Sequence, residues 1–273
     1  MPLTSFQRVV CRLLADHRRA SGESYVAGGA ALQEALSTVR VSRDVDIFHD
    51  TDEALVATWD ADRRLLIEAG LEVRILRERP SFVEARVTGG NGGVLIQWTR
   101  DSAFRFFPLV EHPDFGLVLH PFDLATNKVL ALVGRLEARD WIDVIECADR
   151  LQPLGYLAWA ACGKDPGFSP HAILEEAGRS ARYTDEELTS LAFEGPAPLA
   201  RDASVRWHRQ LHEAMAIISL LPVEHIGSAV LAADGSLLTC DAGLLPDALR
   251  AGRVTFHRGR IRGAFPRVMS VGE

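Results

Sequence analysis

The segment of residues 25–48 constrains the fold of this chain more than any other, because it joins a Gly-Gly turn to a strand with two acidic residues. Residues 25–27 are typical of the end of a strand. Gly28 and Gly29 let the backbone turn tightly before residues 30–37 begin a run of good helix formers. The first amides of such a helix lack partners within the helix and suit a phosphate group. The pattern therefore predicts a strand, a phosphate-binding turn and a helix, in this order.

Asp44 and Asp46 follow on the next predicted strand, one residue apart. Side chains of a strand alternate between its two faces, so both carboxylates share a face while Val45 and Ile47 point into the core. Two carboxylates on one face can hold Mg²⁺ or Mn²⁺ against a triphosphate. A Gly-Gly turn alone is usually a simple turn, and an Asp-x-Asp pair alone is usually a solvated strand face. Their order and spacing favour a phosphate site beside a metal site.

Composition places the chain among ordinary globular proteins, with 273 residues of which 47% are hydrophobic and 25% charged. No apolar run approaches the roughly 20 residues of a membrane span, so we expect a cytoplasmic protein with no membrane partner. The four cysteines show no Cys-x-x-Cys pairing, which favours reduced thiols over a zinc site. The net charge of −7 argues against nonspecific coating of nucleic acid but leaves room for a local basic patch.

The hydrophobic pattern divides the chain into three parts. Residues 1–120 alternate helical segments with strand-like runs, which predicts a small mixed sheet flanked by helices. Residues 121–222 are dominated by helical patterns, which predicts a helical domain. Residues 223–273 return to short strands, with a hairpin signal near residue 234. We therefore expect an α+β protein with a catalytic domain, a helical domain and a C-terminal β-hairpin segment over these ranges.

A second group of polar residues lies in the predicted helical domain. Only two of the 30 basic residues are lysines, Lys128 and Lys164, so a lysine at 128 within an apolar stretch indicates a compact ammonium that reaches a phosphate. The plain alternative is a lysine on a helix surface. Arg139, Asp140 and Asp143 lie within about one helical turn, and the two aspartates share a face. We expect them to support the site, with Asp143 as an additional carboxylate.

Four motifs follow one another along the chain. They are Gly28-Gly29-x-Ala31-Leu32, Arg40-x-Ser42-x-Asp44-x-Asp46, Lys128-x-x-Ala131-Leu132-x-x-Arg135 and Arg139-Asp140-x-x-Asp143. In these motifs and their order, the chain resembles the AbiEii/AbiGii toxin-type nucleotidyltransferases, a branch of the polymerase-β-like nucleotidyltransferase superfamily. The resemblance covers roughly residues 22–220.

The resemblance implies a nucleotidyltransferase domain built on a small mixed sheet and followed by a helical domain. It implies that Gly28 and Gly29 cradle the triphosphate of an NTP, and that Arg40 and Ser42 contribute to nucleotide binding. The same resemblance implies that the Asp-x-Asp pair binds Mg²⁺ or Mn²⁺ and that Lys128 contacts phosphate.

One departure from the superfamily pattern concerns the predicted strand of residues 94–98. Superfamily enzymes usually carry a third carboxylate there, which acts as a base and as a ligand of the second metal. This chain has Gln97 at that place. Asp101, Glu84 and Asp143 are the candidates to substitute for the missing carboxylate.

These observations lead to one main hypothesis and two alternatives. The chain is expected to be a metal-dependent nucleotidyltransferase that moves a nucleoside monophosphate from an NTP to an acceptor and releases pyrophosphate. The resemblance suggests a toxin of a toxin–antitoxin or phage-defence system, with transfer RNA as acceptor and an antitoxin protein as partner. The first alternative is an enzyme that modifies an aminoglycoside-like small molecule, and the second is a nucleotide-binding module whose catalytic set lapsed at Gln97.

Overall fold

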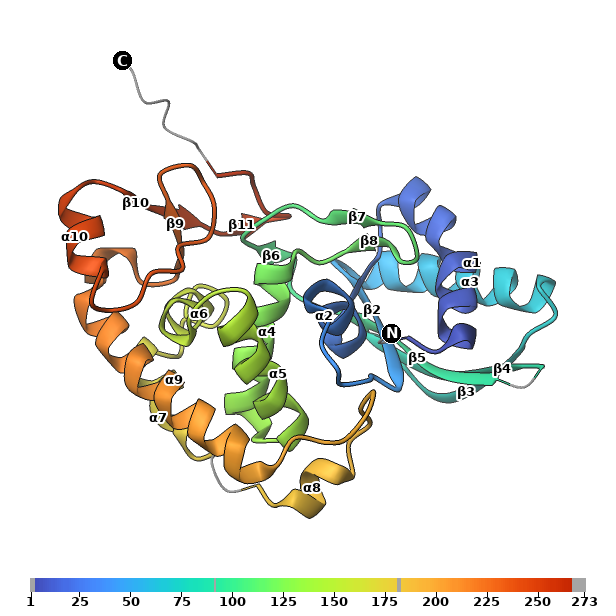
Figure 1. The fold of residues 1–273 in the computed structure, drawn as a ribbon. Coiled ribbons are helices and arrows are strands. Elements are labelled where there is room, and N and C mark those ends of the chain that lie inside the picture. Colours follow the sequence, from blue (N-terminus) through green and yellow to red (C-terminus); the bar gives the residue numbers. More distant parts are fainter. Residues whose placement is uncertain (1–2, 91, 181–182, 267–273) are drawn as a thin grey trace. The chain divides into compact units, whose positions relative to one another are not determined.

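The computed structural model describes residues 3–90, 92–180 and 183–266 (Figure 1). Its residues group into two compact units. The first is drawn from Met1–Ala103, Leu109–His120 and Ala192–Gly195, and the second from Phe104–Pro108, Pro121–Leu191 and Pro196–Glu273. Among the described residues, no helix combines the length and the apolar character needed to cross a membrane.

A mixed sheet of seven strands forms the centre of the first unit within the described ranges. Its strands are β1 (Tyr25–Ala27), β2 (Asp44–His49), β3 (Glu72–Arg79), β4 (Phe82–Gly89), β5 (Gly92–Arg100), β7 (Val110–His112) and β8 (Gly116–Val118). They are ordered β3-β4-β5-β2-β1-β8-β7, with β2 parallel to β5 and β1 parallel to β8, and the other neighbours antiparallel. The predicted mixed sheet is confirmed.

Three helices flank this sheet: α1 (Ser5–Ser21), α2 (Gly28–Leu36) and α3 (Asp52–Glu68). α1 and α3 contact each other and both contact β5. On α3, the ring of Trp59 lies 4.7 Å from that of Trp98, and Asp62 accepts a 2.9 Å hydrogen bond from Trp98 Nε1. Because successive side chains of a strand point to opposite faces, Gln97 lies on the other face of β5 from Trp98. The hydrophobic core therefore occupies one face of the sheet and leaves the other face to polar residues.

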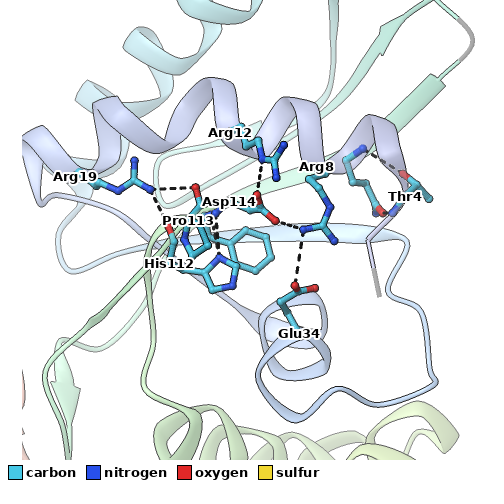
Figure 2. A network of polar contacts seen from close by, with 10 residues as sticks. Thr4, Arg8, Arg12, Arg19, Glu34, His112, Pro113 and Asp114 are labelled. Atoms are coloured by element: carbon cyan, nitrogen blue, oxygen red, sulfur yellow. Dashed lines mark hydrogen bonds and ion pairs between the residues drawn. The ribbon is translucent and has the colours of Figure 1, made fainter. Parts of the chain in front are cut away.

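Charged side chains fix α1 to the turn between β7 and β8 (Figure 2). Arg8 and Arg12 both donate to the buried carboxylate of Asp114. Arg8 also lies 3.8 Å from Glu34 of α2, and Arg19 donates to two backbone carbonyls of the same turn, at 2.9 and 3.1 Å. This network links the first helix, the second helix and the far edge of the sheet.

The second unit is mainly helical. Its helices are α4 (Pro121–Arg135), α5 (Ala138–Arg150), α6 (Leu154–Ala161), α7 (Pro170–Gly178), α8 (Asp185–Thr189), α9 (Ala200–Leu220), the 3₁₀ turn η1 (Val223–His225) and α10 (Leu245–Arg250). α6 packs against α9, and α4 contacts α5, α6 and α7. The helical character predicted after residue 121 is confirmed.

Short strands complete the second unit. β9 (Ser228–Ala232) pairs antiparallel with β10 (Val254–Arg258), with α10 between them in sequence. β11 (Arg260–Ile261) pairs with β6 (Phe104–Arg105). The hairpin expected near residue 234 is present as a bridge between Leu231 and Leu237 with backbone hydrogen bonds between residues 230–232 and 236–238, while β10 pairs along the other edge of β9. The C-terminal segment is rich in short strands, as expected.

Candidate functional site

Gly28 and Gly29 form the turn between β1 and α2. Gly28 has φ +67°, a left-handed conformation that favours glycine. Ala27 precedes this nine-residue helix and offers no side-chain hydrogen bond to its first amides. A helix start without a side-chain cap presents N–H groups and a positive dipole end to an anion.

Asp46 packs directly against Gly28, so that a Cβ added to Gly28 would overlap the Asp46 carboxylate. The antiparallel register of β1 and β2 accounts for this contact, because it places Ala27 opposite Asp46. Asp44 lies two residues earlier on the same face of β2. Val45 and Ile47 are only 2% and 1% exposed, which confirms that they point into the core. The carboxylate pair therefore stands on the polar face, beside the start of α2.

Arg40 and Ser42 gather over the second glycine. A Cβ added to Gly29 would lie 3.0 Å from Ser42 Oγ and 3.1 Å from Arg40 Nη2. The structure thus brings together Gly28, Gly29, Arg40, Ser42 and Asp46, all from the first two motifs.

A distant segment holds the Arg40 loop in place. Residue 41 donates its amide to the carbonyl of Ala192 at 2.8 Å, and Glu194 donates its amide to the carbonyl of residue 39 at 2.7 Å. Arg40 itself bridges to Phe193. Sequence reasoning missed this segment, because the pairing uses backbone groups and leaves no side-chain pattern.

A row of facing residues crosses five strands on the polar side of the sheet: Ala27, Asp46, Gln97, Glu84 and Arg77. Gln97 therefore lies on the strand beside Asp46, where the resemblance leads us to expect a carboxylate. Gln97 Nε2 donates to Glu84 Oε1 at 3.0 Å. Arg77 Nε lies 3.6 Å from Glu84 Oε2. The Glu84 carboxylate, one of the candidates to replace the missing one, is thus held by an amide and a guanidinium.

Lys128, Asp140 and Asp143 meet in the second unit, with Arg135 as a fourth member. Lys128 Nζ lies 2.9 Å from Asp140 Oδ1 and 3.2 Å from Asp143 Oδ2. Arg135 donates to both carboxylate oxygens of Asp140, at 2.5 and 2.9 Å. Burial alone would raise the pKa of Asp140, but the hydrogen bonds of Arg135 and the charge of Lys128 outweigh it and hold the pKa below its usual value.

The other members of the second group are also engaged in ion pairs. Arg139 Nε lies 2.6 Å from Glu137 Oε2 in a partly exposed pair. Lys164 Nζ lies 2.8 Å from the buried Asp123 Oδ1. Lys128 is 7% exposed, so the alternative of a helix-surface lysine is wrong. Both lysines of the chain neutralise buried carboxylates.

Few side chains of the described residues are placed to serve as ligands of a metal ion. Within the described residues, no three His, Cys, Asp or Glu side chains stand close enough to hold a metal together. Mg²⁺ commonly keeps several waters and binds through one or two carboxylates plus substrate phosphates. Asp44 and Asp46 fit that mode, since Asp46 lies at the glycine turn whose amides suit the phosphates.

Comparisons with known proteins identify the fold. No protein-family model matches the chain, and the comparison with curated proteins finds no match. Among solved structures, the chain is similar to MenT4, a nucleotidyltransferase toxin from Mycobacterium tuberculosis, with a TM-score of 0.53 and 16% identity over 80% of this chain and 85% of that one. It is also similar to JHP933 from Helicobacter pylori, with a TM-score of 0.51 and 12% identity over 80% of this chain and 95% of that one. The chain therefore shares its fold with these two proteins, and the fold is that of a nucleotidyltransferase, as the resemblance implied.

Proposed function

We propose that this chain is a metal-dependent nucleotidyltransferase that transfers a nucleoside monophosphate from an NTP to an acceptor and releases pyrophosphate. The observation that carries the proposal is the packing of Asp46 against Gly28 at the uncapped start of α2, with Asp44 on the same face. The fold shared with MenT4, which is described as a nucleotidyltransferase toxin, supports the same reaction class. We propose residues 1–120 as the catalytic domain and residues 121–222 as the helical domain.

The carboxylate pair, the glycine turn and Arg40 each have a role in this proposal. Asp44 and Asp46 would hold Mg²⁺ or Mn²⁺, which when bound polarises the α-phosphate and lowers the pKa of the acceptor hydroxyl. The amides of Gly28 and Gly29 donate to phosphate oxygens and stabilise the negative charge that develops on the leaving pyrophosphate. Arg40, beside Gly29, adds a charge-assisted donor to the same phosphates.

We propose supporting roles for the group of Lys128, Arg139, Asp140 and Asp143. Lys128 is proposed as a phosphate contact, and its ion pairs with Asp140 and Asp143 hold its ammonium group in a fixed position. Arg139 supports this group through the preceding loop, where it pairs with Glu137.

The proposed acceptor and protein partner rest on the resemblance to toxin-type nucleotidyltransferases. We propose transfer RNA as the acceptor and an antitoxin protein as a partner, as in a toxin–antitoxin or phage-defence system. Gln97 favours a second candidate, because an amide rather than a carboxylate stands beside Asp46. That candidate is a nucleotide-binding module that binds NTP without turnover.

The test is the pair of variants Asp44→Asn and Asp46→Asn, with Asp60→Asn on the exposed face of α3 as the control. Pyrophosphate release is measured with each NTP, in Mg²⁺ and in Mn²⁺, with pooled transfer RNA and with an aminoglycoside panel as acceptors. Mn²⁺ binding is followed separately by electron paramagnetic resonance. Both site variants should lose turnover and weaken Mn²⁺ binding, while stability changes by less than about 1 kcal/mol.

The control should behave as wild type. Wild-type activity in either site variant would refute the metal assignment. NTP binding without turnover under any combination would select the binding module, and turnover restricted to the aminoglycosides would replace transfer RNA by a small-molecule acceptor.

A further inference from the structure

The outermost two strands at one edge of the sheet, β3 and β4, carry four arginines on a single face. In the antiparallel register, Arg74 faces Arg86, Arg77 faces Glu84 and Arg79 faces Phe82. Residues directly opposite each other in a sheet share a face, and a bulge between Ile75 and Arg77 preserves this arrangement along β3. We call Arg74, Arg77, Arg79 and Arg86 the β3–β4 arginine surface.

This surface is continuous with the carboxylate pair. Arg86 faces Leu95 of β5, which in turn faces Asp44 of β2. Glu84 is joined to Asp46 in the same way through Gln97. Neighbouring strands lie about 4.8 Å apart, so the backbones of Arg86 and Asp44 are separated by about 10 Å. The arginines and the proposed metal ligands therefore occupy one face of one sheet.

The charge of this surface is largely unneutralised. All four arginines are exposed. Arg77 is paired with Glu84, whereas Arg74, Arg79 and Arg86 have no ion pair or hydrogen bond from their side chains among the described residues. On the β3 and β4 part of this face, the other acid, Glu72, accepts a hydrogen bond from Thr88.

Arg74 and Arg86 stand directly opposite each other, and like charges in that position destabilise a sheet. A violation of this kind is expected where function requires it. A bound anion would remove the repulsion.

We propose that the β3–β4 arginine surface binds the phosphate backbone of the RNA acceptor and leads its end toward Asp44 and Asp46. This inference rests on the proposed function. Guanidinium groups bind phosphate through paired N–H donors, and such contacts fix the position of a nucleic acid without reading its sequence. Side chains two residues apart on a strand are spaced by about 7 Å, so the surface presents a repeated array rather than a single site.

The same charges argue against the small-molecule alternative. An aminoglycoside-like acceptor is cationic, and this surface would repel it. The net charge of −7 remains compatible with the proposal, because a local array of arginines attracts a polyanion even on an acidic protein.

The experiment compares Arg74→Gln/Arg86→Gln with Arg63→Gln/Arg64→Gln. The control removes the same number of positive charges from exposed positions of α3, which packs against the opposite face of the sheet. Binding of fluorescein-labelled pooled transfer RNA is measured by fluorescence anisotropy over a series of KCl concentrations.

The surface variant should bind about tenfold more weakly, and the slope of log K against log salt should fall by about 1.5, because each lost phosphate contact reduces it by roughly 0.7 to 0.9. Its melting temperature should equal or exceed that of wild type, since the Arg74–Arg86 repulsion is gone. The control should keep the wild-type slope.

Equal affinity and equal slope in both double variants would overturn the proposal. Labelled polyglutamate is the second probe. If its binding depends on Arg74 and Arg86 while the binding of transfer RNA does not, the surface binds an acidic protein and the RNA proposal is wrong. NTP and Mn²⁺ binding by the surface variant should be unchanged. If wild type binds transfer RNA through these arginines but shows no turnover, the surface stands and the proposed function fails.

Discussion

Replacing Gly28 by alanine tests the site at its most crowded point. Gly28 combines a left-handed backbone with direct contact to the Asp46 carboxylate. An alanine there meets two separate difficulties, a backbone conformation that side chains disfavour and an overlap between its Cβ and Asp46. Since Asp46 is the proposed metal ligand, the overlap must move that carboxylate or the start of α2.

The two effects have different magnitudes and different readouts. A non-glycine residue in the left-handed region costs about 1 to 2 kcal/mol of folding free energy. A displacement of about 1 Å in a catalytic group reduces the rate by about 100-fold. Gly28→Ala should therefore lose about 1 to 2 kcal/mol of stability and most of its activity.

Gly22→Ala is the matched control. Gly22 caps the end of α1 with φ +66°, nearly the value of Gly28, and a Cβ added there meets nothing within 4 Å. It should show the same loss of stability in urea unfolding without a loss of turnover. Gly29→Ala should be intermediate, because its Cβ meets only the ends of the Ser42 and Arg40 side chains, at 3.0 and 3.1 Å.

The assay is pyrophosphate release at saturating Mg²⁺ and NTP, read together with the unfolding free energy of each variant. Equal activity in Gly28→Ala and Gly22→Ala would show that the contact with Asp46 has no part in the reaction. A loss of activity in both, in proportion to their stability, would show that the backbone strain alone explains the effect.

Three further predictions use other parts of the molecule. Lys128→Met should destabilise the protein by about 3 kcal/mol in urea unfolding, because it leaves buried Asp140 with one partner fewer; a loss below about 1 kcal/mol would contradict this. Gln97→Glu should destabilise it by about 1 to 3 kcal/mol in urea unfolding, because the amide that donates to Glu84 is replaced by a second carboxylate; unchanged stability would refute the reasoning. Burial lowers the pKa of His49 from 6.5 to about 4, so its contribution of roughly 3 kcal/mol is present above pH 6.5 and lost as the pH falls toward 4; His49→Asn should flatten that part of the profile in pH-dependent unfolding.

The sequence by itself determined the features that depend on neighbours along the chain. The run of helix-forming residues after Gly29 predicted α2. The alternation around Asp44 and Asp46 predicted which side chains face the core, because a strand has a fixed period of two. The Gly28-Gly29 turn predicted a helix start with free amides, because the backbone angle φ of a glycine and the first amides of a helix are local properties.

Only the tertiary structure decided the pairings between distant residues. Helix α6 is apolar on every side and fully buried, so it shows no periodicity that separates a buried face from a solvated one. The segment of residues 192–195 joins Arg40 through backbone hydrogen bonds, which any sequence can make. A pattern in the sequence predicts that a face or a charged side chain will be buried. The residues that such a face or side chain contacts depend on which elements pack together. For that reason the sequence singled out Lys128, and only the structure showed that Asp140 and Asp143 hold it.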